Sequence, residues 1–462
     1  MRKAVLDIGK THIKLLFLSD NTELASFSCK NSPITGMYSQ CDVTAIWSWL
    51  TETFRSCNLT SSVEALIITT HGAAAALIND ANLSEPTGLV LPILDYEDEK
   101  VESCESDYCD IRPSFSETFS PSLPAGLNLG KQLFWLQKNY PEEFSSATAI
   151  LMYPQYWAWR LCGEKATELT SLGCHTDLWM PVLKQYSRLV TQQNWQHLFP
   201  PVKNAWDCLG TVRAAVCKET GLSLSCKVFT GVHDSNASLL RYLKLNKNKA
   251  LSVISSGTWT ILMQVNGRLD SLADHKDTLS NVDVYGNPVA CARFMGGREY
   301  ERICTALGGN IVMSPSTQDI QIAIDNDWMV TPDYSHGNGP FGGKTPRQHC
   351  PDKPLSPQAI ATLYCALMID RRLDDLNAQG DIYIEGAFLK NKRLCELLAQ
   401  LRPRQIVWLS ADDTGTVLGA SALTEFEQYD GNNVAVEHCA PSHFDKIEKY
   451  KAQWLARINQ SN

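Results

Sequence analysis

The chain has 462 residues, of which 41 are Lys or Arg and 50 are Asp or Glu, so its formal net charge is −9. A chain this long predicts two or three domains of roughly 100–200 residues. The acidic balance argues against a general nucleic-acid binder, which carries a basic face. No stretch reaches the ~18 apolar residues that a membrane-spanning helix needs.

The N-terminus lacks the apolar run of a signal peptide, so we expect a cytoplasmic protein. The 16 cysteines are scattered, and no CxxC pair occurs. Cys104 and Cys109 are the closest pair, but no His cluster accompanies them as in a metal site. Free thiols are therefore expected rather than disulfides or metal ligands.

The first expected elements form a hairpin, in which residues 3–18 read as a strand, a tight polar turn and a second strand. Residues 250–265 repeat this pattern, with strands at 251–255 and 259–263 around a turn at 256–258. The same unit near the start of each half of the chain predicts two related domains.

Strands and helices alternate between and after these hairpins, which predicts a mixed α/β fold. Further strands are expected at 65–70, 227–230, 381–385 and 405–409. Helices are expected at 129–139, 154–162, 235–243, 358–377, 392–401, 416–425 and 445–458. Residues 327–357 are rich in Gly, Pro and Asn and predict a long loop. A polar run at 245–249 suggests domains at 1–245 and 246–430, with a C-terminal extension at 431–462.

The first turn contains Gly9, Lys10 and Thr11 after Asp7. A phosphate-binding P-loop would need Gly where Ala4 stands, and would lead into a helix rather than a strand, so we reject that motif. Amides and a hydroxyl in such a turn can bind phosphate oxygens, and Asp7 can hold Mg²⁺ through water. The alternative is a plain hairpin with a solubilising turn.

The second turn offers hydroxyls and a glycine amide from Ser256, Gly257 and Thr258. Two turns of one design favour a clamp on a polyphosphate over two unrelated hairpins.

Asp234 stands where a strand ends and a helix begins. An N-cap explains any single Asp at such a place, because it accepts from free helix amides. The alternative is a carboxylate that orients and deprotonates an attacking hydroxyl in phosphoryl transfer. His233 is uninformative here.

Gly386 and Ala387 follow a strand and would let the backbone approach a flat ligand closely. The small residues of 413–422 suit either close helix packing or the wall of a nucleotide pocket. Asp95 lies in an acidic loop, which either contacts substrate hydroxyls or is merely solvated.

The order of these parts resembles the FGGY carbohydrate kinases, which include glycerol, xylulose, rhamnulose and fuculose kinases. The parts are an Asp-x-Gly hairpin, a Gly-x-x-Asp step, a Ser-Gly-Thr hairpin, a Gly-Ala turn and a Gly-Thr-x-x-Gly-Ala helix. The resemblance runs from about residue 5 to about residue 423. The run at 155–163 resembles a helix of the family, with Cys162 where Thr is usual, and the run at 295–299 resembles a segment of the deoxyketose-kinase branches.

The resemblance implies a two-domain, actin-like and ribonuclease H-like α/β fold with an interdomain cleft, and ATP and Mg²⁺ as cofactors. It implies that Asp234 is the general base and that Asn391 lines the adenosine pocket with the Gly-Ala turn. The residues implied to face phosphates and magnesium are Asp7, Gly9, Lys10, Thr11, Gly257 and Thr258. His71 and Gly72 fall where the family has a sugar-binding loop, and xylulose kinases carry a His there.

Two departures from the family pattern matter. Glu385 precedes Gly386 where paired glycines are usual, which leaves the nucleotide preference open. The loop after Thr70 lacks the Arg-Glu of glycerol kinases, which argues against glycerol. Residues 73–76 are all Ala and would either face the methyl group of a deoxyketose or simply pack.

We therefore expect an ATP-dependent kinase of a ketose or deoxyketose, whose partners are the sugar and ATP, with no nucleic acid and no membrane. The oligomeric state stays open, with a homodimer among the alternatives. A catalytically idle sugar- or nucleotide-binding regulator on the same scaffold is the second hypothesis, and an actin-like filament protein is the third.

Overall fold

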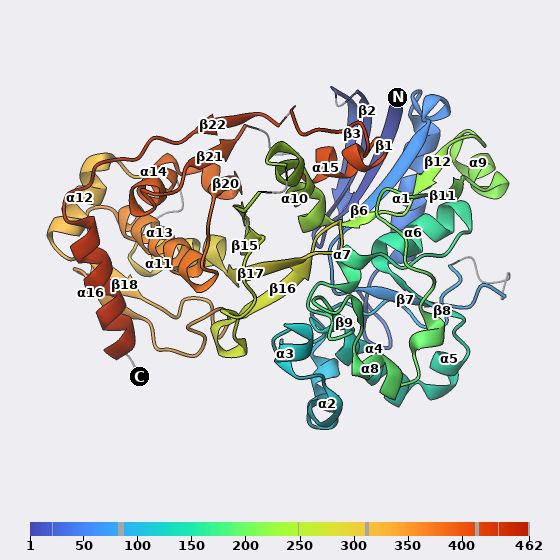
Figure 1. The fold of residues 1–462 in the computed structure, drawn as a ribbon, viewed down its shortest axis with the longest axis horizontal. Helices are drawn as coiled ribbons and strands as arrows, with labels where there is room; N and C mark the ends of the chain where they lie inside the picture. The colour runs from blue at the N-terminus through green and yellow to red at the C-terminus, as the bar shows by residue number, and fades with distance from the viewer. Residues whose placement is uncertain are drawn as a thin grey trace. The chain divides into compact units, whose positions relative to one another are not determined.

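The structure of the chain is a computed structural model, which describes residues 1–462 except 21, 82–86, 248, 310–313, 412–414, 433 and 461–462. The chain forms two compact units (Figure 1). The first comprises Met1–Lys244, Ser280–Pro288 and Thr414–Gly431, and the second comprises Leu245–Leu279, Val289–Asp413 and Asn432–Asn462. None of the described helices is long and apolar enough to cross a membrane. All 16 cysteines lie in the described part and are free, as expected.

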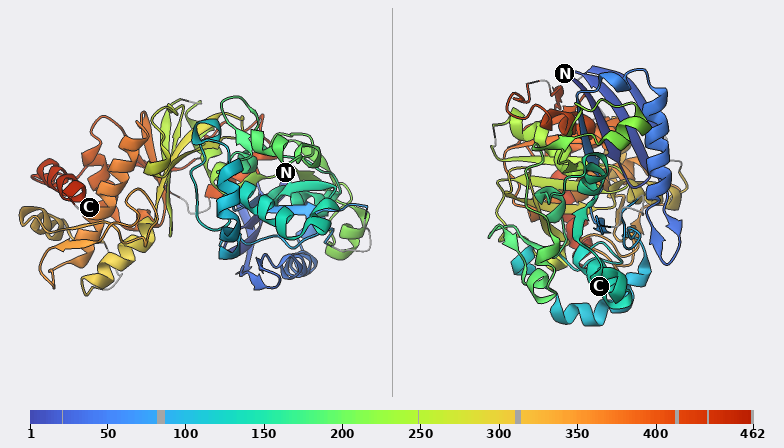
Figure 2. Two further views of the ribbon diagram at one scale, coloured as in Figure 1. Left: turned by 90° about the horizontal axis from the view of Figure 1, so that it is seen from below. Right: turned by 90° about the vertical axis from the view of Figure 1, so that its right-hand side faces the viewer.

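A mixed seven-stranded sheet forms the centre of the first unit. Its strands are β1 (Arg2–Ile8), β2 (His12–Ser19), β3 (Thr22–Lys30), β6 (Ala65–Thr70), β11 (Cys208–Thr211), β12 (Lys227–Phe229) and β13 (Val232–His233). The order is β11-β12-β6-β1-β2-β3, and β13 also pairs with β6. β1 runs antiparallel to β2 and parallel to β6. The right-hand view of Figure 2 shows the N-terminal strands, in blue, side by side.

Alternation along β1 separates the two faces of this sheet. Ala4, Leu6 and Ile8 join a core that includes residues of α1 (Val43–Ser56), α6 (Tyr153–Cys162) and α9 (Ala214–Thr220). On the other face, buried Lys3 donates to the Ser421 carbonyl of α15 (Gly415–Leu423) at 3.3 Å and pairs with Glu425 at 2.5 Å. Asp7 therefore shares the face of α15.

Gly419 of α15 packs on α10 (Asp234–Leu245), where a Cβ would lie 1.7 Å from the carbonyl oxygen of Ala237. This contact shows close helix packing at Gly419, and the wall of a nucleotide pocket stays a prediction for the segment 413–422. Asp413 and Thr414, at its start, lie outside the described residues.

The rest of the first unit surrounds a second core that includes Leu133, Ile150, Leu178 and Trp195. Its helices are α2 (Glu105–Ile111), α3 (Phe115–Thr118), α4 (Leu129–Asn139), α5 (Pro141–Ser145), α7 (Leu169–Leu172) and α8 (Arg188–Gln192). Three strand pairs accompany them: β4 (Ile34–Thr35) with β5 (Ser39–Gln40), β7 (Ala75–Ile78) with β8 (Ala149–Met152), and β9 (Trp179–Met180) with β10 (Gln185–Tyr186).

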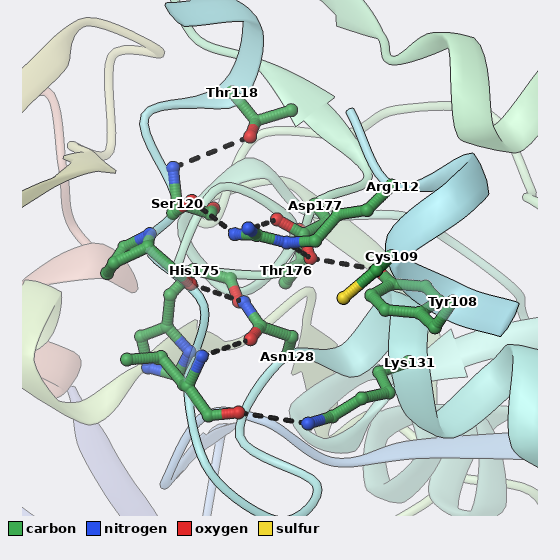
Figure 3. Close-up of polar contacts among 12 residues, drawn as sticks. Tyr108, Cys109, Arg112, Thr118, Ser120, Asn128, Lys131, His175, Thr176 and Asp177 are labelled. Carbon is green, nitrogen blue, oxygen red and sulfur yellow. Dashed lines mark hydrogen bonds and ion pairs between the residues drawn. The ribbon is translucent and has the colours of Figure 1, made fainter. Parts of the chain in front are cut away.

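A buried polar cluster anchors the segment that follows α7 (Figure 3). Arg112 binds the carboxylate of Asp177 through Nε at 3.0 Å and Nη2 at 3.3 Å, and the Tyr108 hydroxyl donates to it at 2.8 Å. Asn128 Nδ2 donates to the carbonyl of His175 at 3.1 Å. Burial raises the pKa of Asp177 to about 6, against the effect of Arg112. The cluster therefore ties α2 and α4 to residues 175–177.

The second unit repeats the sheet design of the first. Its sheet has the order β16-β17-β15-β14-β20-β21-β22. The strands are β14 (Leu251–Ser256), β15 (Thr260–Val265), β16 (Thr278–Val282), β17 (Pro288–Phe294), β20 (Asp381–Gly386), β21 (Val407–Ser410) and β22 (Val436–His438). β14 runs antiparallel to β15 and parallel to β20, as β1 does with β2 and β6. The expectation of two related α/β domains is confirmed.

The helices of the second unit are α11 (Gly296–Ala306), α12 (Thr317–Asp325), α13 (Pro357–Asp375), α14 (Lys392–Leu401) and α16 (Ile447–Gln460). Figure 2 (left) shows α16, in red, beside the orange helices of this unit. The short 3₁₀ helices of the chain are η1 (Thr60–Ser62), η2 (Glu99–Cys104), η3 (Gln196–Leu198), η4 (Asp274–Lys276) and η5 (Ala387–Lys390).

The predicted loop over 327–357 is partly wrong, because β18 (Met329–Thr331) and β19 (Arg347–His349) pair within it. Trp454 of α16 donates to the Val330 carbonyl at 2.9 Å and so holds β18 in place. The other predicted elements are confirmed to within a few residues, and α6 ends at Gly163, as expected, with φ +89°. Many elements were not predicted from the sequence, among them β3, α1, α9, α11 and β17.

Candidate active site

Parallel strands of the first sheet end at one edge and bring the predicted residues together. Ile8 of β1 lies opposite Thr70 of β6, which in turn lies opposite His233 of β13. The chain then continues into the turn 9–11, the His71-Gly72 pair and Asp234. Because the carboxyl ends of parallel strands share an edge, residues from three distant parts of the sequence meet there.

Asp7 and Asp234 are the two carboxylates that interact at this edge. Burial raises the pKa of Asp7 to about 7, and the negative charge of Asp234 adds to this increase. Two carboxylates at one site favour a bound cation, because a cation stabilises their ionised forms.

Mg²⁺ fits Asp7 chemically, because this ion commonly takes one or two carboxylates and fills its remaining positions with water and substrate phosphates. Across the described ranges, no group of three or more His, Cys, Asp or Glu side chains could hold a metal ion. Asp7 would hold the ion directly or through water, and water and substrate phosphates would fill the remaining positions.

Asp234 is the first residue of α10, and its side chain is 31% exposed. Its Oδ1 accepts the backbone N–H of Ser235 at 2.6 Å and lies 3.2 Å from Nε2 of His233. One carboxylate oxygen is thus held by the protein, and the side chain still reaches solvent.

His233 and Asn236 determine the proton positions beside Asp234. Burial lowers the pKa of His233, so the ring is neutral at pH 7. Asn236 Nδ2 lies 3.3 Å from His233 Nδ1. An amide nitrogen can only donate, so Nδ1 accepts, and the single ring proton lies on Nε2. The proton on Nε2 then lies near the Asp234 carboxylate, 3.2 Å from its Oδ1.

Gly72 lies directly against this imidazole, because a Cβ there would be 2.9 Å from Nε2 of His233. His71, the neighbouring candidate, lies against the rings of Tyr96 and Tyr153, with centroids 5.5 and 5.2 Å away. Burial lowers its pKa. Nδ1 of His71 lies 2.8 Å from the Gly72 carbonyl, so it carries the proton and leaves Nε2 as an acceptor.

Lys10 reaches the acidic loop that holds Asp95. Its ammonium group donates to Asp95, lies 3.3 Å from Glu97, and sits 4.5 Å from the ring centroid of Tyr96. Asp95 is 5% exposed, and it also accepts from the Ser39 hydroxyl at 3.2 Å. The network places Asp95 beside the β1–β2 turn.

The remaining residues of the first turn have local partners. The Gly9 amide donates to the His12 carbonyl at 3.0 Å, which closes the hairpin. Thr11 is exposed, and its hydroxyl lies 3.1 Å from His12 Nδ1.

The second unit brings its own candidates together in the same way, since Ser256 of β14 lies opposite Gly386 of β20. The Ser256 hydroxyl donates to the Glu385 carbonyl at 2.6 Å and accepts from the Phe388 amide at 2.9 Å. It therefore joins the two turns. Gly257 and Thr258, in the following turn, are exposed.

Gly386 has φ +84°, and a Cβ there would lie 2.1 Å from the Ser256 carbonyl oxygen, so the turn requires glycine. Ala387 begins η5, and Asn391 caps α14 by accepting from the Leu394 amide at 3.2 Å. Asn391 also donates to the Thr362 hydroxyl at 2.8 Å.

Sequence reasoning missed the partners of the base. His233 was judged uninformative, and Asn236 and Tyr96 were not considered. The signal for His233 and Asn236 is their spacing of three residues around the start of α10, where their side chains lie 3.3 Å apart. Tyr96 is adjacent to a candidate, Asp95, but no sequence pattern predicts its contact with His71.

Comparisons with known proteins agree with this architecture. Residues 3–240 match the family model "FGGY family of carbohydrate kinases, N-terminal domain", and residues 248–432 match "Carbohydrate kinase FGGY, C-terminal domain". A crystal structure of a carbohydrate kinase from Novosphingobium aromaticivorans is 31% identical, with a TM-score of 0.88, over 98% of this chain and 100% of that one.

A xylulose kinase structure from Lactobacillus acidophilus shares the fold at 14% identity, with a TM-score of 0.77 over 99% of this chain and 96% of that one. An L-fuculokinase from Salmonella typhi is 24% identical over 58% of this chain. That match spans 57% of the fuculokinase, so this chain covers little more than half the length of this curated relative. The predicted two-domain, actin-like fold is confirmed, and the chain belongs to the FGGY family of carbohydrate kinases.

Proposed function

We propose that the protein transfers the γ-phosphate of ATP to a hydroxyl group of a small sugar, a ketose or deoxyketose. The observation that carries this proposal is the state of Asp234. It is a partly exposed carboxylate at the edge of the first sheet, next to Asp7, with one oxygen bound by the Ser235 amide. Phosphoryl transfer needs little more from a protein than alignment, charge compensation and such a base.

On the acceptor side, the Ser235 amide holds Oδ1 of Asp234, with His233 Nε2 3.2 Å from the same oxygen, and Oδ2 is left to receive the proton of the attacking hydroxyl. Nε2 of His71 can accept from a second hydroxyl of the sugar. Asp95, fixed by Lys10, can accept from a third. A polyol bound by several such groups keeps one hydroxyl oriented for attack.

On the donor side, we assign phosphate binding to Gly9, Lys10 and Thr11 and to the turn at Ser256, Gly257 and Thr258. The glycine turn at 386–387 and Asn391 would bind the nucleoside. Bound at Asp7, Mg²⁺ would compensate the charge of the phosphates. Thr11 and Thr258 are exposed and can donate hydroxyls to phosphate oxygens, whereas the Gly9 and Gly257 amides close their hairpins and the Ser256 hydroxyl binds the Glu385 carbonyl.

The choice of a ketose rests on the relatives and on the acceptor groups. The similar proteins include an L-fuculokinase and a xylulose kinase. The idea that residues 73–76 face a deoxysugar methyl loses support, because Ala74, Ala75 and Ala76 belong to the hydrophobic cores. ATP-dependent sugar phosphorylation takes place where ATP is available, so we place the protein in the cytoplasm.

A coupled assay of ADP formation over a panel of ketoses, deoxyketoses and short polyols tests the proposal. We expect one or a few ketoses to stimulate ADP formation at least ~100-fold over the rate without acceptor. Thermal shifts with the same sugars and with Mg-ATP provide the second measurement. Ligands that raise the melting temperature while no sugar is phosphorylated would contradict the kinase assignment.

A further inference from the structure

Glu168 is a buried carboxylate outside the candidate active site. It precedes α7 and is 1% exposed. Its oxygens accept from the backbone amides of Thr170 at 2.9 Å and Ser171 at 3.3 Å, and from the Thr170 hydroxyl at 2.6 Å. Burial raises its pKa to about 7, and these three donors oppose the increase. A buried carboxylate is costly, so a purely local cap does not explain why a glutamate stands here.

The Thr170 hydroxyl connects this carboxylate to β13, the strand immediately before Asp234. The backbone N–H of His233 donates to Thr170 Oγ1 at 3.0 Å. An N–H cannot accept, so the single hydroxyl proton of Thr170 is left for Glu168. The direction of both hydrogen bonds is therefore fixed: the His233 amide donates to Thr170, and Thr170 donates to Glu168.

These two hydrogen bonds fix the backbone immediately before Asp234. On one side His233 lies opposite Thr70 in the β6 ladder, and on the other its amide is held by Thr170. Asp234 begins α10 one residue later. A small rotation of the backbone at His233 would move both the Asp234 carboxylate and the neighbouring His233 imidazole.

The segment that carries Thr170 is itself anchored at its far end. The Thr176 hydroxyl donates to the Leu172 carbonyl at 2.5 Å, and the Gly130 amide donates to the Thr176 carbonyl at 2.8 Å. Asp177 is bound by Arg112 and Tyr108, as Figure 3 shows. The residues on both sides of α7 are thus held by hydrogen bonds. Thr170 is the α7 residue that binds the backbone immediately before Asp234.

We propose that Glu168 is a positioning residue for Asp234, acting through the Thr170 hydroxyl and the His233 amide. The inference rests on the proposed kinase function, because it concerns the geometry of the base in that reaction. Glu168 and Thr170 hold the carboxylate at the distance and angle at which it receives the acceptor proton, and they do not bind sugar or nucleotide themselves.

Thr170→Val tests the link, because it removes the hydroxyl and keeps the branched shape. We expect kcat to fall about 10- to 100-fold, the size of effect that a misplacement near 1 Å produces. The KM values for acceptor and ATP should change less than about threefold, and Thr170→Ser should restore kcat to within about threefold of the original protein.

Thr220→Val is the matched control. Thr220 is also fully buried, donates to the Val216 carbonyl at 2.7 Å and accepts from the Leu222 amide at 3.2 Å. It lies in α9, away from the strand that carries the base. We expect it to lower the melting temperature about as much as Thr170→Val and to leave kcat unchanged. Equal losses of kcat in both variants would overturn the proposal.

Glu168→Gln keeps the size of the side chain but loses the charge, and it supplies a result if Thr170→Val does not fold. We expect kcat to fall about tenfold at constant KM, and an unchanged kcat in either Glu168→Gln or Thr170→Val would overturn the positioning role. The activity of the original protein separates a failure of the proposed function from a failure of this inference. If the original protein phosphorylates no sugar, the proposed kinase function fails as well. If it is active and the variants keep its kcat, only the positioning role of Glu168 is refuted.

Discussion

The imidazole Nε2 of His233 lies 3.2 Å from Oδ1 of Asp234, and Asn236 on the opposite side of the ring leaves the proton on that nitrogen. The Ser235 amide donates to Oδ1, so one oxygen of the proposed base is occupied before any substrate binds, and we assign Oδ2 to the acceptor. The neighbouring imidazole is neutral, so the negative charge of Asp234 stays available for the proton that we propose it receives.

Replacing Asp234 by Asn should lower kcat by about 10³-fold or more, because an amide cannot take the proton of the attacking hydroxyl. The affinity for Mg-ATP should stay within about threefold, since Asp234 is assigned to the acceptor. Steady-state kinetics and calorimetric titration with a non-hydrolysable ATP analogue measure the two quantities. Turnover close to that of the original protein would remove Asp234 from its role.

His71→Ala should raise the KM for the sugar about tenfold or more and leave the KM for ATP nearly unchanged. The reason is that the neutral ring, held by the Gly72 carbonyl, presents Nε2 as an acceptor for a sugar hydroxyl. His71→Gln, which keeps an acceptor group, serves as the comparison. The sugar contact is refuted if both substrates respond to His71→Ala by the same factor.

Lys10 offers a test between phosphate binding, which the sequence predicts, and support of the acceptor loop, which its contacts suggest. If it mainly fixes Asp95, Lys10→Met should raise the KM of the sugar about tenfold; if it mainly binds phosphate, the KM of ATP should rise instead. Glu97→Gln should have a small effect, because Glu97 is 66% exposed and such pairs contribute little. Exposed Glu99→Gln, in the same region, is the control and should change neither KM.

Asp7 should make the stability of the ligand-free protein depend on pH. Its pKa is raised to about 7 by burial and by Asp234, so the folded state binds this proton more tightly than the unfolded state. The resulting stabilisation is present below the ordinary pKa near 4 and is lost as the pH rises through about 7. Asp7→Asn removes this dependence. We therefore expect the melting temperature of Asp7→Asn minus that of the original protein to be about 2–5 °C larger at pH 8 than at pH 5.

Differential scanning calorimetry without Mg²⁺ and nucleotide checks this difference. A relative melting temperature that is the same at both pH values would show that Asp7 ionises normally. Activity should be lost in Asp7→Asn despite the higher stability, as expected for a site whose function costs stability.

Gly386→Ala should lower the free energy of unfolding by about 2–4 kcal/mol and raise the KM for ATP about tenfold or more. Its positive φ and its close approach to the Ser256 carbonyl both oppose a side chain. Gly308→Ala is the matched control, because Gly308 has φ +75° but no atom within 4 Å of the added Cβ. The control should lose only about 1 kcal/mol in urea unfolding and should bind ATP normally.

Elements with a strong local pattern were predictable from the sequence, and long-range partners were not. The two hairpins follow from alternation and turn residues, and α4 follows from its helical spacing. The ion pair of Lys10 with Asp95 joins positions 85 residues apart, and only the fold brings them together. The same holds for Thr170 and His233, whose contact involves a backbone amide that no sequence pattern reveals.

The contact of Lys3 with the Ser421 carbonyl joins positions 418 residues apart within one folded unit. At a synthesis rate of roughly 5–20 residues per second, the first strand waits on the order of 20–80 s for the helix that covers its second face. The nascent first unit therefore spends most of translation with one face of its sheet uncovered and Lys3 unpaired from α15. A chain truncated before α15 should aggregate, and the N-terminal strands of this protein should be clients of ribosome-associated chaperones.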